Sequence, residues 1–364
     1  MTKTIDPYGS ELVADYVKVI KDFGLEPFDI KNYPSPNKLM RRGVVFAERD
    51  IKPVLAAMKG KKPFYVLSGI MPTAKKVHLG TKMVVENIKY FQEHGAKTFC
   101  LVADLEAAAA RGISLKEARE NALEFQIPAY LALGLDPKNT TFYFQSENKE
   151  VMHLAYEFSK KITLNEYKAI FGVADPGRIM SALTQAADIL YPQLKERMPG
   201  VIPVGVDQDP AIRLTRDIVR RTKEKKFFLP SGLYHKFTPS LDGALKMSKS
   251  KPESSIDLPD DPKKAVKKVM CAKTGGRKTV EEQRKMGGVP EDCIIFELYK
   301  QHLMEDDNDL KKIYDDCRGG RLLCGEDKQI CAGLISRFME NLEKDIDKAR
   351  KDIDMSEIAS GARF

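Results

Sequence analysis

The chain has 364 residues, of which 43% are hydrophobic and 31% are charged, a composition that excludes a disordered tail, a collagen-like fibre and a disulfide-stapled miniprotein. The formal net charge of +8 is mild for this length, and no uninterrupted run of about 18 apolar residues indicates a membrane span. Charged residues stand where a signal peptide would need an apolar centre, so we expect a cytoplasmic protein.

Strand-like and helix-like segments alternate through the middle of the chain. Before them, residues 1–62 are polar and mixed, and we expect them to form a small appended segment. Short β-branched and aromatic runs predict strands at 64–69, 98–103, 141–145 and 201–206. Apolar residues at helical spacing predict helices at 82–94, 114–133, 148–162, 177–191 and from Asp209 onward, with Asp209 as the capping residue. This alternation predicts an α/β domain with a parallel sheet over 63–261.

Beyond about residue 262 the strand signals stop, and the remaining segments have helical periodicity. We therefore expect an all-helical C-terminal domain over 262–364. Between Leu245 and Pro290 twelve Lys or Arg residues outnumber six Asp or Glu residues. Such a patch is typical of a surface that binds phosphate, as nucleotide or nucleic acid, or of a solvated Lys-rich surface. The six cysteines form no CxxC pair, so we expect reduced thiols and no metal site.

Polar residues gather after three of the predicted strands, at the end of a parallel sheet where ligands bind. The first cluster runs from Pro72 to Thr81, and its Gly80 leaves the backbone open just as a helix begins. The unpaired N–H groups of a helix N-terminus suit a phosphate. Thr73 and His78 could donate hydrogen bonds to a phosphoryl group in this position.

Two further clusters have the same character. The segment 246–251, KMSKSK, combines three ammonium groups with two hydroxyls, which is typical of a mobile loop that closes on a triphosphate or of an ordinary basic surface loop. The segment Gly205–Asp209 follows the strand 201–206. It offers a carboxylate and an amide that could bind ribose hydroxyls or the head group of an amino acid.

Together these motifs resemble the signature pair of class I aminoacyl-tRNA synthetases. PTAKKVHLG at 72–80 resembles the first signature, and KMSKS at 246–250 resembles the second. Finer features resemble the tryptophanyl enzymes of the archaeal and eukaryotic type, namely RRGVVF at 41–46, DQDP at 207–210 and GGR at 275–277. The resemblance covers most of the chain and implies a Rossmann-like nucleotide-binding domain followed by the helical domain.

The resemblance implies a two-step reaction. The carboxylate of L-tryptophan attacks the α-phosphate of ATP, and the acyl group then moves to the 3′ end of tRNA(Trp). Thr73 and His78 would contact the phosphates in the transition state, and Mg²⁺ would bridge the phosphates. Lys246 and Lys249 would hold the leaving pyrophosphate. The other residues implied to bind ATP are Gly69, Pro72, Gly80, Thr81, Gly205, Asp207, Met247 and Ser248, with Asp207 on the ribose.

The motifs say less about recognition of the amino acid. The residues implied on this side of the site are Glu106, Gln185, Asp188 and Gln208. Leu67 and Leu101 stand where the tryptophanyl pattern often has Tyr and Gln, so other groups must read the indole. Asp188 is a candidate acceptor for the indole N–H, with a helix-surface carboxylate as the alternative. Thr81 replaces the second His of the first signature and can still donate one hydrogen bond.

Three other functions stay open. The tyrosyl enzymes of this class use a Gln-x-x-Asp motif, which Gln185 and Asp188 match, although their pattern has Tyr where this chain has Ser181. A stand-alone nucleotidyltransferase also holds ATP with a His-x-Gly-His motif, but it lacks KMSKS and a long helical domain. A non-catalytic RNA-binding paralogue is the third alternative, against which the intact His78 and Lys246 argue.

The resemblance also implies partners for the C-terminal half. The helical domain would bind the anticodon, with Arg318, Arg321 and the basic stretch 263–285 as candidate RNA contacts. The family forms homodimers, so we expect a homodimer here.

Overall fold

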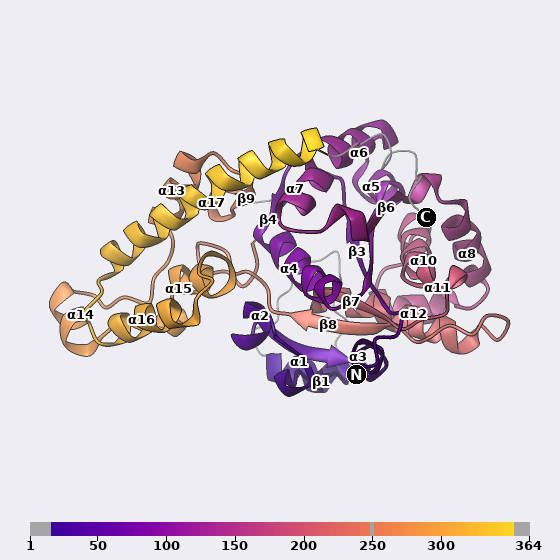
Figure 1. The fold of residues 1–364 in the computed structure, drawn as a ribbon, viewed down its shortest axis with the longest axis horizontal. Helices are drawn as coiled ribbons and strands as arrows, with labels where there is room; N and C mark the ends of the chain where they lie inside the picture. Colours follow the sequence, from indigo (N-terminus) through magenta and orange to yellow (C-terminus); the bar gives the residue numbers. More distant parts are fainter. Residues whose placement is uncertain (1–15, 248–250, 353–364) are drawn as a thin grey trace.

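In the computed structural model, which describes residues 16–247 and 251–352, a seven-stranded sheet runs through the middle of the molecule (Figure 1). From one edge to the other its strands are β1 (Glu26–Pro27), β2 (Val45–Arg49), β8 (Ser231–His235), β7 (Gly200–Gly205), β3 (Tyr65–Ile70), β5 (Lys97–Val102) and β6 (Thr140–Phe144). A separate two-stranded sheet joins β4 (Val77–His78) to β9 (Asp257–Leu258).

The five strands from β8 to β6 are parallel, so the predicted parallel sheet is confirmed. The four predicted strands correspond to β3, β5, β6 and β7 with bounds shifted by one residue. The segment 1–62 contributes β1 and β2, and β2 pairs antiparallel with β8. Part of the segment that we expected to be appended therefore completes one edge of the sheet.

Helices cover both faces of the sheet because alternate strand residues point in opposite directions. In β3, Val66 and Ile70 join one apolar core, whereas Tyr65 and Leu67 join the other. The first core includes residues of α3 (Lys52–Lys59), α4 (Leu79–Glu93) and α7 (Ile127–Ala132), together with helices of the C-terminal part. The helices of the second are α1 (Tyr16–Phe23), α8 (Lys149–Ser159), α9 (Leu164–Phe171), α10 (Pro176–Leu190) and α12 (Asp209–Arg221). Other helices of this part are α2 (Lys38–Arg41), α5 (Asp104–Arg111) and α11 (Pro192–Lys195).

The helix predicted over 114–133 is interrupted. It consists of α6 (Leu115–Asn121), a π-helical turn (Ala122–Gln126) and α7. Pro128 has no N–H and cannot bond to the carbonyl of Glu124 four residues earlier. That carbonyl instead accepts a hydrogen bond from Nε of Arg350 at 2.7 Å. The proline therefore explains why the α-helical pattern is not continuous here.

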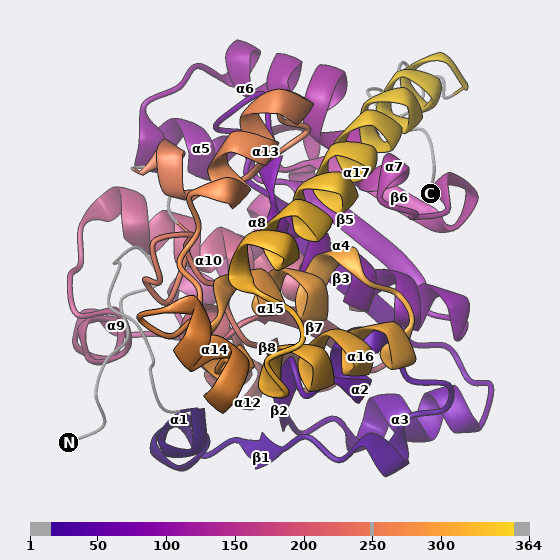
Figure 2. The same cartoon turned by 90° about the vertical axis from the view of Figure 1, so that its left-hand side faces the viewer.

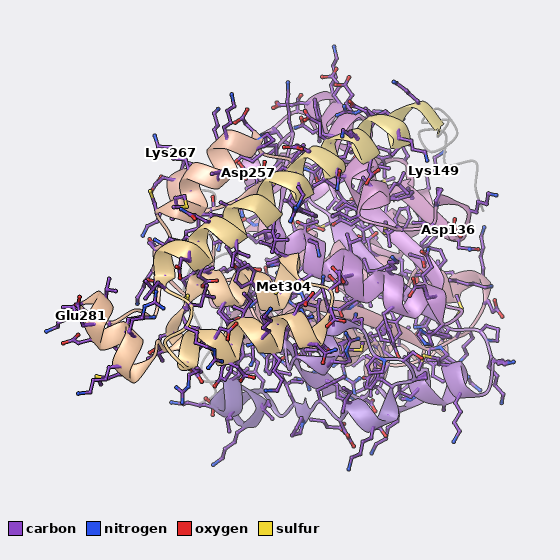
Figure 3. All side chains as sticks on the ribbon, turned by 60° about the vertical axis from the view of Figure 1, so that its left-hand side comes forward. Asp136, Lys149, Asp257, Lys267, Glu281 and Met304 are labelled. Atoms are coloured by element: carbon purple, nitrogen blue, oxygen red, sulfur yellow. The ribbon has the colours of Figure 1, made fainter. Side chains whose placement is uncertain are left out.

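The C-terminal part is helical, as predicted. Its helices are α13 (Pro262–Met270), α14 (Val280–Met286), α15 (Ile294–Leu298), α16 (Asp307–Arg318) and α17 (Cys324–Asp352). Figure 2 shows α17 crossing the molecule in front of the sheet. In Figure 3, Glu281 of α14 lies at the far tip of this part, on the opposite side from Asp136 and Lys149. Among the described helices, none combines the length and the apolar character that a membrane span needs.

The sheet has a topological switch point between β3 and β7. These strands are parallel neighbours, but the chain leaves β3 toward β5 and β6, and leaves β7 toward β8. In open α/β sheets, ligands bind at the carboxyl ends of strands at such a point. The first and third polar clusters follow β3 and β7 directly, so the fold brings them to the same edge.

Candidate active site

The first cluster leads from the exposed Gly69 at the end of β3 to the start of α4. His78 is the N-terminal cap of α4, because its Nδ1 accepts the backbone N–H of Thr81 at 3.3 Å. In a neutral imidazole this places the proton on Nε2. A Cβ atom at position 80 would lie 2.9 Å from the imidazole ring, so Gly80 makes room for it. The cap holds the ring at a helix end that attracts phosphate.

Two amide side chains hold the backbone of the loop that precedes His78. Nδ2 of Asn121 donates to the carbonyl of Pro72 at 3.2 Å, and Nε2 of Gln126 donates to the carbonyl of Ala74 at 2.6 Å. Thr73 lies between these two anchored residues. Both amides come from the segment around the π-helical turn, which therefore shapes the loop. Sequence reasoning missed them, since a polar residue in a helical pattern does not reveal a partner in a distant loop.

The two signature segments meet through the small sheet. In the antiparallel pairing of β4 with β9, His78 stands opposite Asp257. Strand β9 follows the segment 246–251 after only a few residues, so the chain that leaves this segment runs beside the strand that carries the imidazole. At the start of the segment, the N–H of Met247 donates to the carbonyl of Thr238 at 3.0 Å. The lysine-rich segment is therefore held at its start by Thr238 and is followed by a strand that pairs with the first cluster.

Lys246 reaches the third cluster directly. Its Nζ donates to Oδ2 of Asp207 at 2.9 Å and lies 4.7 Å from the centre of the Phe237 ring. The ammonium group is therefore held at the carboxyl end of β7. Ser248 and Lys249 lie outside the described residues.

The third cluster depends on a close approach at the end of β7. A Cβ atom at position 205 would lie 2.6 Å from Oδ1 of Asp207, so Gly205 leaves space for that carboxylate. The prediction that Asp209 caps α12 is wrong. Its buried carboxylate instead accepts from Nε of Arg49 at 2.9 Å and from the hydroxyl of Tyr234 at 2.6 Å. Because these donors lie on β2 and β8, the Asp209 carboxylate points toward the sheet and does not cap the helix.

Two of the four residues expected on the amino-acid side, Gln185 and Asp188, lie on α10. Nε2 of Gln185 is 3.4 Å from Oε1 of Gln208, which follows β7. One turn further, Asp188 is fully buried, so the helix-surface alternative is wrong. Its Oδ1 accepts from the hydroxyl of Tyr143 at 3.0 Å, and its Oδ2 accepts from Nε2 of Gln145 at 2.6 Å.

Glu106 belongs to the same buried network. Nε2 of Gln145 also donates to Oε1 of Glu106 at 2.9 Å. Burial raises the pKa of Glu106 to about 7 and raises the pKa of Asp188 well above its usual range, with the neighbouring Glu106 adding to the second effect. A carboxyl group of this kind becomes anionic when an ammonium group approaches. Sequence reasoning missed Tyr143 and Gln145, which are uncharged and belong to no motif.

Of the candidate RNA contacts, Arg318 is the last residue of α16 and Arg321 lies in the turn that follows. Arg318 and Arg321 are both exposed. Arg318 is 3.7 Å from a carboxylate oxygen of Glu291, and Nε of Arg321 donates to Asp316 at 2.6 Å. Across residues 16–247 and 251–352, no group of three or more His, Cys, Asp or Glu side chains is arranged to hold a metal ion.

Similar proteins give the site its context. The family profile "tRNA synthetases class I (W and Y)" matches residues 58–340. A tryptophan–tRNA ligase of Hyperthermus butylicus is 44% identical over 359 residues, covering 95% of each chain. One of Methanocaldococcus jannaschii is 42% identical and covers 95% of this chain and 96% of its own. The crystal structure of tryptophanyl-tRNA synthetase from the hyperthermophilic archaeon Aeropyrum pernix K1 is similar with a TM-score of 0.88 and 43% identity, covering 95% of this chain and 97% of that chain.

Proposed function

The chain belongs to the class I tRNA synthetases for tryptophan and tyrosine, and on this premise we propose how its residues perform the reaction. Its function is that of a tryptophan–tRNA ligase, the activity of archaeal relatives that are 42–44% identical over 95% of the chain. ATP is a substrate of this enzyme family. The carboxylate of tryptophan attacks the α-phosphate, pyrophosphate leaves, and the acyl group of the adenylate moves to the 3′ end of tRNA(Trp).

The first step depends on positioning and charge rather than on a covalent intermediate with the protein. Thr73 and His78 donate hydrogen bonds to the phosphates as their charge redistributes, and Lys246 and Lys249 hold the departing pyrophosphate. The capped position of His78 and the nearby β9 strand support this assignment. In the free protein Lys246 is paired with Asp207, so it must release this carboxylate to reach a phosphate.

The nucleotide lies along the edge formed by the carboxyl ends of β3 and β7. Gly69 and Gly205 let the ligand approach the backbone, and Asp207 accepts hydrogen bonds from the ribose hydroxyls. Phosphate and base are held by the remaining residues of the clusters, Pro72, Gly80, Thr81, Met247 and Ser248. Mg²⁺ would accompany ATP as part of the substrate complex, since it prefers phosphate oxygens and water as ligands.

The ammonium and carboxylate of tryptophan lie toward α10 and β7. Gln185 and Gln208 orient the head group, with their 3.4 Å contact as support. Glu106 and Asp188 supply negative charge deeper in the site. Both of these carboxyl groups accept a hydrogen bond from Nε2 of Gln145.

The second substrate requires the helical part. We assign residues 63–261 to catalysis, 262–364 to anticodon binding and 1–62 to an N-terminal segment that extends the sheet. Arg318 and Arg321 are the proposed RNA contacts, and their exposure supports this role. The protein works as a homodimer in the cytoplasm.

The observation that carries this proposal is the meeting of two distant segments at one edge of the sheet. β4, which carries His78, pairs with β9 directly after the lysine-rich segment, and Lys246 contacts Asp207 at the end of β7. These contacts support a phosphate site at the start of α4 that is shared by groups from all three polar clusters.

The test is ATP–pyrophosphate exchange measured with each amino acid in turn. We expect exchange that depends on tryptophan. Exchange with tyrosine alone would replace this function by that of the tyrosyl enzymes, and exchange without any amino acid would indicate a stand-alone nucleotidyltransferase. No exchange under any condition would leave a non-catalytic RNA-binding protein.

A further inference from the structure

Gln145 carries a buried acceptor that no described residue satisfies. The side chain is fully buried directly after β6, and its Oε1 has no hydrogen-bond partner in the described part of the chain. Its Nε2 donates to both Glu106 and Asp188. Because these two partners are carboxyl groups, they hold the nitrogen on their side and turn the oxygen away from them. A buried acceptor without a donor lowers stability, so this oxygen is poised for a donor that comes from outside.

Asp188 is less suited to receive such a donor. Each of its oxygens already accepts a hydrogen bond, one from the hydroxyl of Tyr143 and one from Nε2 of Gln145. The carboxylate of Asp188 therefore fixes the orientation of the Gln145 amide. A second buried polar group also has no partner among the described residues, namely the hydroxyl of Ser181. Ser181 lies on the face of α10 that carries Asp188. These two unsatisfied groups leave an acceptor and a hydroxyl that a polar ligand could satisfy.

Apolar residues border one part of this network. Leu67, Leu101, Tyr143 and Ala187 all belong to the second core of the sheet. In the pairing of β5 with β6, Leu101 stands directly opposite Tyr143. A ligand group that matches these surroundings is large, flat and apolar and carries a single donor. The indole ring has this character, since its N–H donates and it has no acceptor.

We propose that Oε1 of Gln145 accepts the indole N–H of tryptophan and gives the site its specificity for this ring nitrogen. The inference rests on the proposed function, because it assigns a residue to the amino-acid side of that site. Glu106 and Asp188 are positioning residues in this role: they hold the nitrogen of Gln145 so that its oxygen points toward the substrate. Leu67 and Leu101 supply apolar contact but no acceptor.

The experiment compares tryptophan with 3-(benzothiophen-3-yl)alanine, in which sulfur replaces the indole N–H at nearly the same shape. In ATP–pyrophosphate exchange we expect the unmodified protein to prefer tryptophan by about 10- to 100-fold in kcat/KM, as for a site whose buried acceptor is left unpaired by the analogue. In Gln145→Met, which keeps the length of the side chain without an acceptor, we expect the preference to fall to about 1. Tryptophan should lose activity while the analogue keeps it.

Gln92→Met is the matched control, because this partly buried glutamine bonds Thr140 and the backbone near Asp136, away from the site. It should keep the preference of the unmodified protein. A structural defect would lower activity with both substrates equally, so a change in the ratio identifies recognition of the N–H. A preference that survives Gln145→Met, or that collapses only in Asp188→Asn, would overturn the proposal.

Different results contradict the role of Gln145 and the ligase function. An unmodified protein without tryptophan-dependent exchange contradicts the ligase function itself. Normal exchange with equal rates for both substrates contradicts only the role of Gln145. Should Gln145→Met not fold, a crystal structure of the unmodified protein with tryptophan decides: an indole nitrogen within about 3.2 Å of Gln145 Oε1 supports the proposal, and a nitrogen facing another acceptor overturns it.

Discussion

The imidazole of His78 is placed by the backbone around it. It caps α4, it stands in a strand beside Asp257, and Gly80 leaves room for its ring. A donor fixed in this way costs no reorganisation when charge develops on a phosphate. We expect His78→Ala to lower kcat for adenylate formation by about 10²–10³-fold with little change in KM. The measurement is exchange kinetics, with the exposed His153→Ala as control, and an effect confined to KM would mean that His78 only binds substrate.

Glu106 makes stability depend on pH. Its pKa is raised by burial from 4.5 to about 7, so the folded state favours the protonated form. This contribution to stability is complete below about pH 4.5 and is lost as the pH rises through about 7. Glu106→Gln removes the titration, and at pH 8 we expect the variant to be more stable than the unmodified protein by about 3 kcal/mol.

Urea unfolding of both proteins, without substrates, at pH 4.5 and pH 8 measures this difference. The difference in unfolding free energy between the two proteins should be close to zero at pH 4.5 and should reach its full size at pH 8. The exposed Glu120→Gln on α6 is the control, which should follow the pH dependence of the unmodified protein. A constant gap between Glu106→Gln and the unmodified protein would contradict the buried titration.

The sequence indicates candidate site residues where they stand in motifs, but it does not indicate the neutral residues that lie outside the motifs. His78 and Lys246 stand in short patterns with a recognisable chemistry. Gln145, Asn121 and Gln126 act through contacts with residues far away in the chain, and their local sequence is that of an ordinary strand end or helix. Their roles follow only from the three-dimensional arrangement, in which buried amides must find partners.

At the scale of elements, the π-helical turn is coupled through Gln126 to the loop that precedes His78. Its Nε2 donates to the carbonyl of Ala74 at 2.6 Å. Gln126→Leu leaves this carbonyl without its donor and lets Thr73 and His78 shift. Because displacements of about 1 Å can cost up to about 10²-fold in rate, we expect kcat to fall by at least about 10-fold and the free energy of unfolding by only about 1 kcal/mol.

Single-turnover adenylate formation and urea unfolding test this prediction together. Lys116→Ala, an exposed position of α6, is the control and should change neither quantity appreciably. A loss of stability without a loss of rate would show that Gln126 serves the fold alone.

The elements that the sequence predicted well are those with strong local patterns. β3, β5, β6 and β7 have β-branched or aromatic residues and are buried, so their sequences alone indicate strands. β8 starts with Ser231 and Gly232, which have low strand propensity. The glycine is needed because a Cβ there would lie 2.4 Å from the hydroxyl oxygen of Tyr234. Strand β8 forms because it pairs with β2 and β7 on either side. This pairing leaves no pattern in the sequence of β8 itself.

At the scale of the molecule, the helical part and the sheet share one core. Buried residues of α13, α15 and α17 belong to the same apolar cluster as β3 and α4. A polar contact also joins the two parts. Nε2 of His302, just after α15, lies 2.9 Å from the hydroxyl of Thr238. The carbonyl of Thr238 in turn accepts the backbone N–H of Met247. The proposed anticodon-binding part is thus joined to the base of the lysine-rich segment. We expect the two parts to unfold together rather than as independent domains.

Arg42 offers the sharpest test of this coupling. The guanidinium donates to the carbonyls of Lys300, Met304 and Glu305 at 3.0, 2.7 and 3.0 Å, and to Asp307 at 2.7 Å. Arg42→Ala leaves these acceptors unpaired, which we expect to cost about 3 kcal/mol and to lower the temperature of a single calorimetric transition by several degrees. Arg41→Ala, a more exposed neighbour, should cost less than about 1 kcal/mol. Two separate transitions, with only one shifted by Arg42→Ala, would mean that the sheet and the helical part are independently stable.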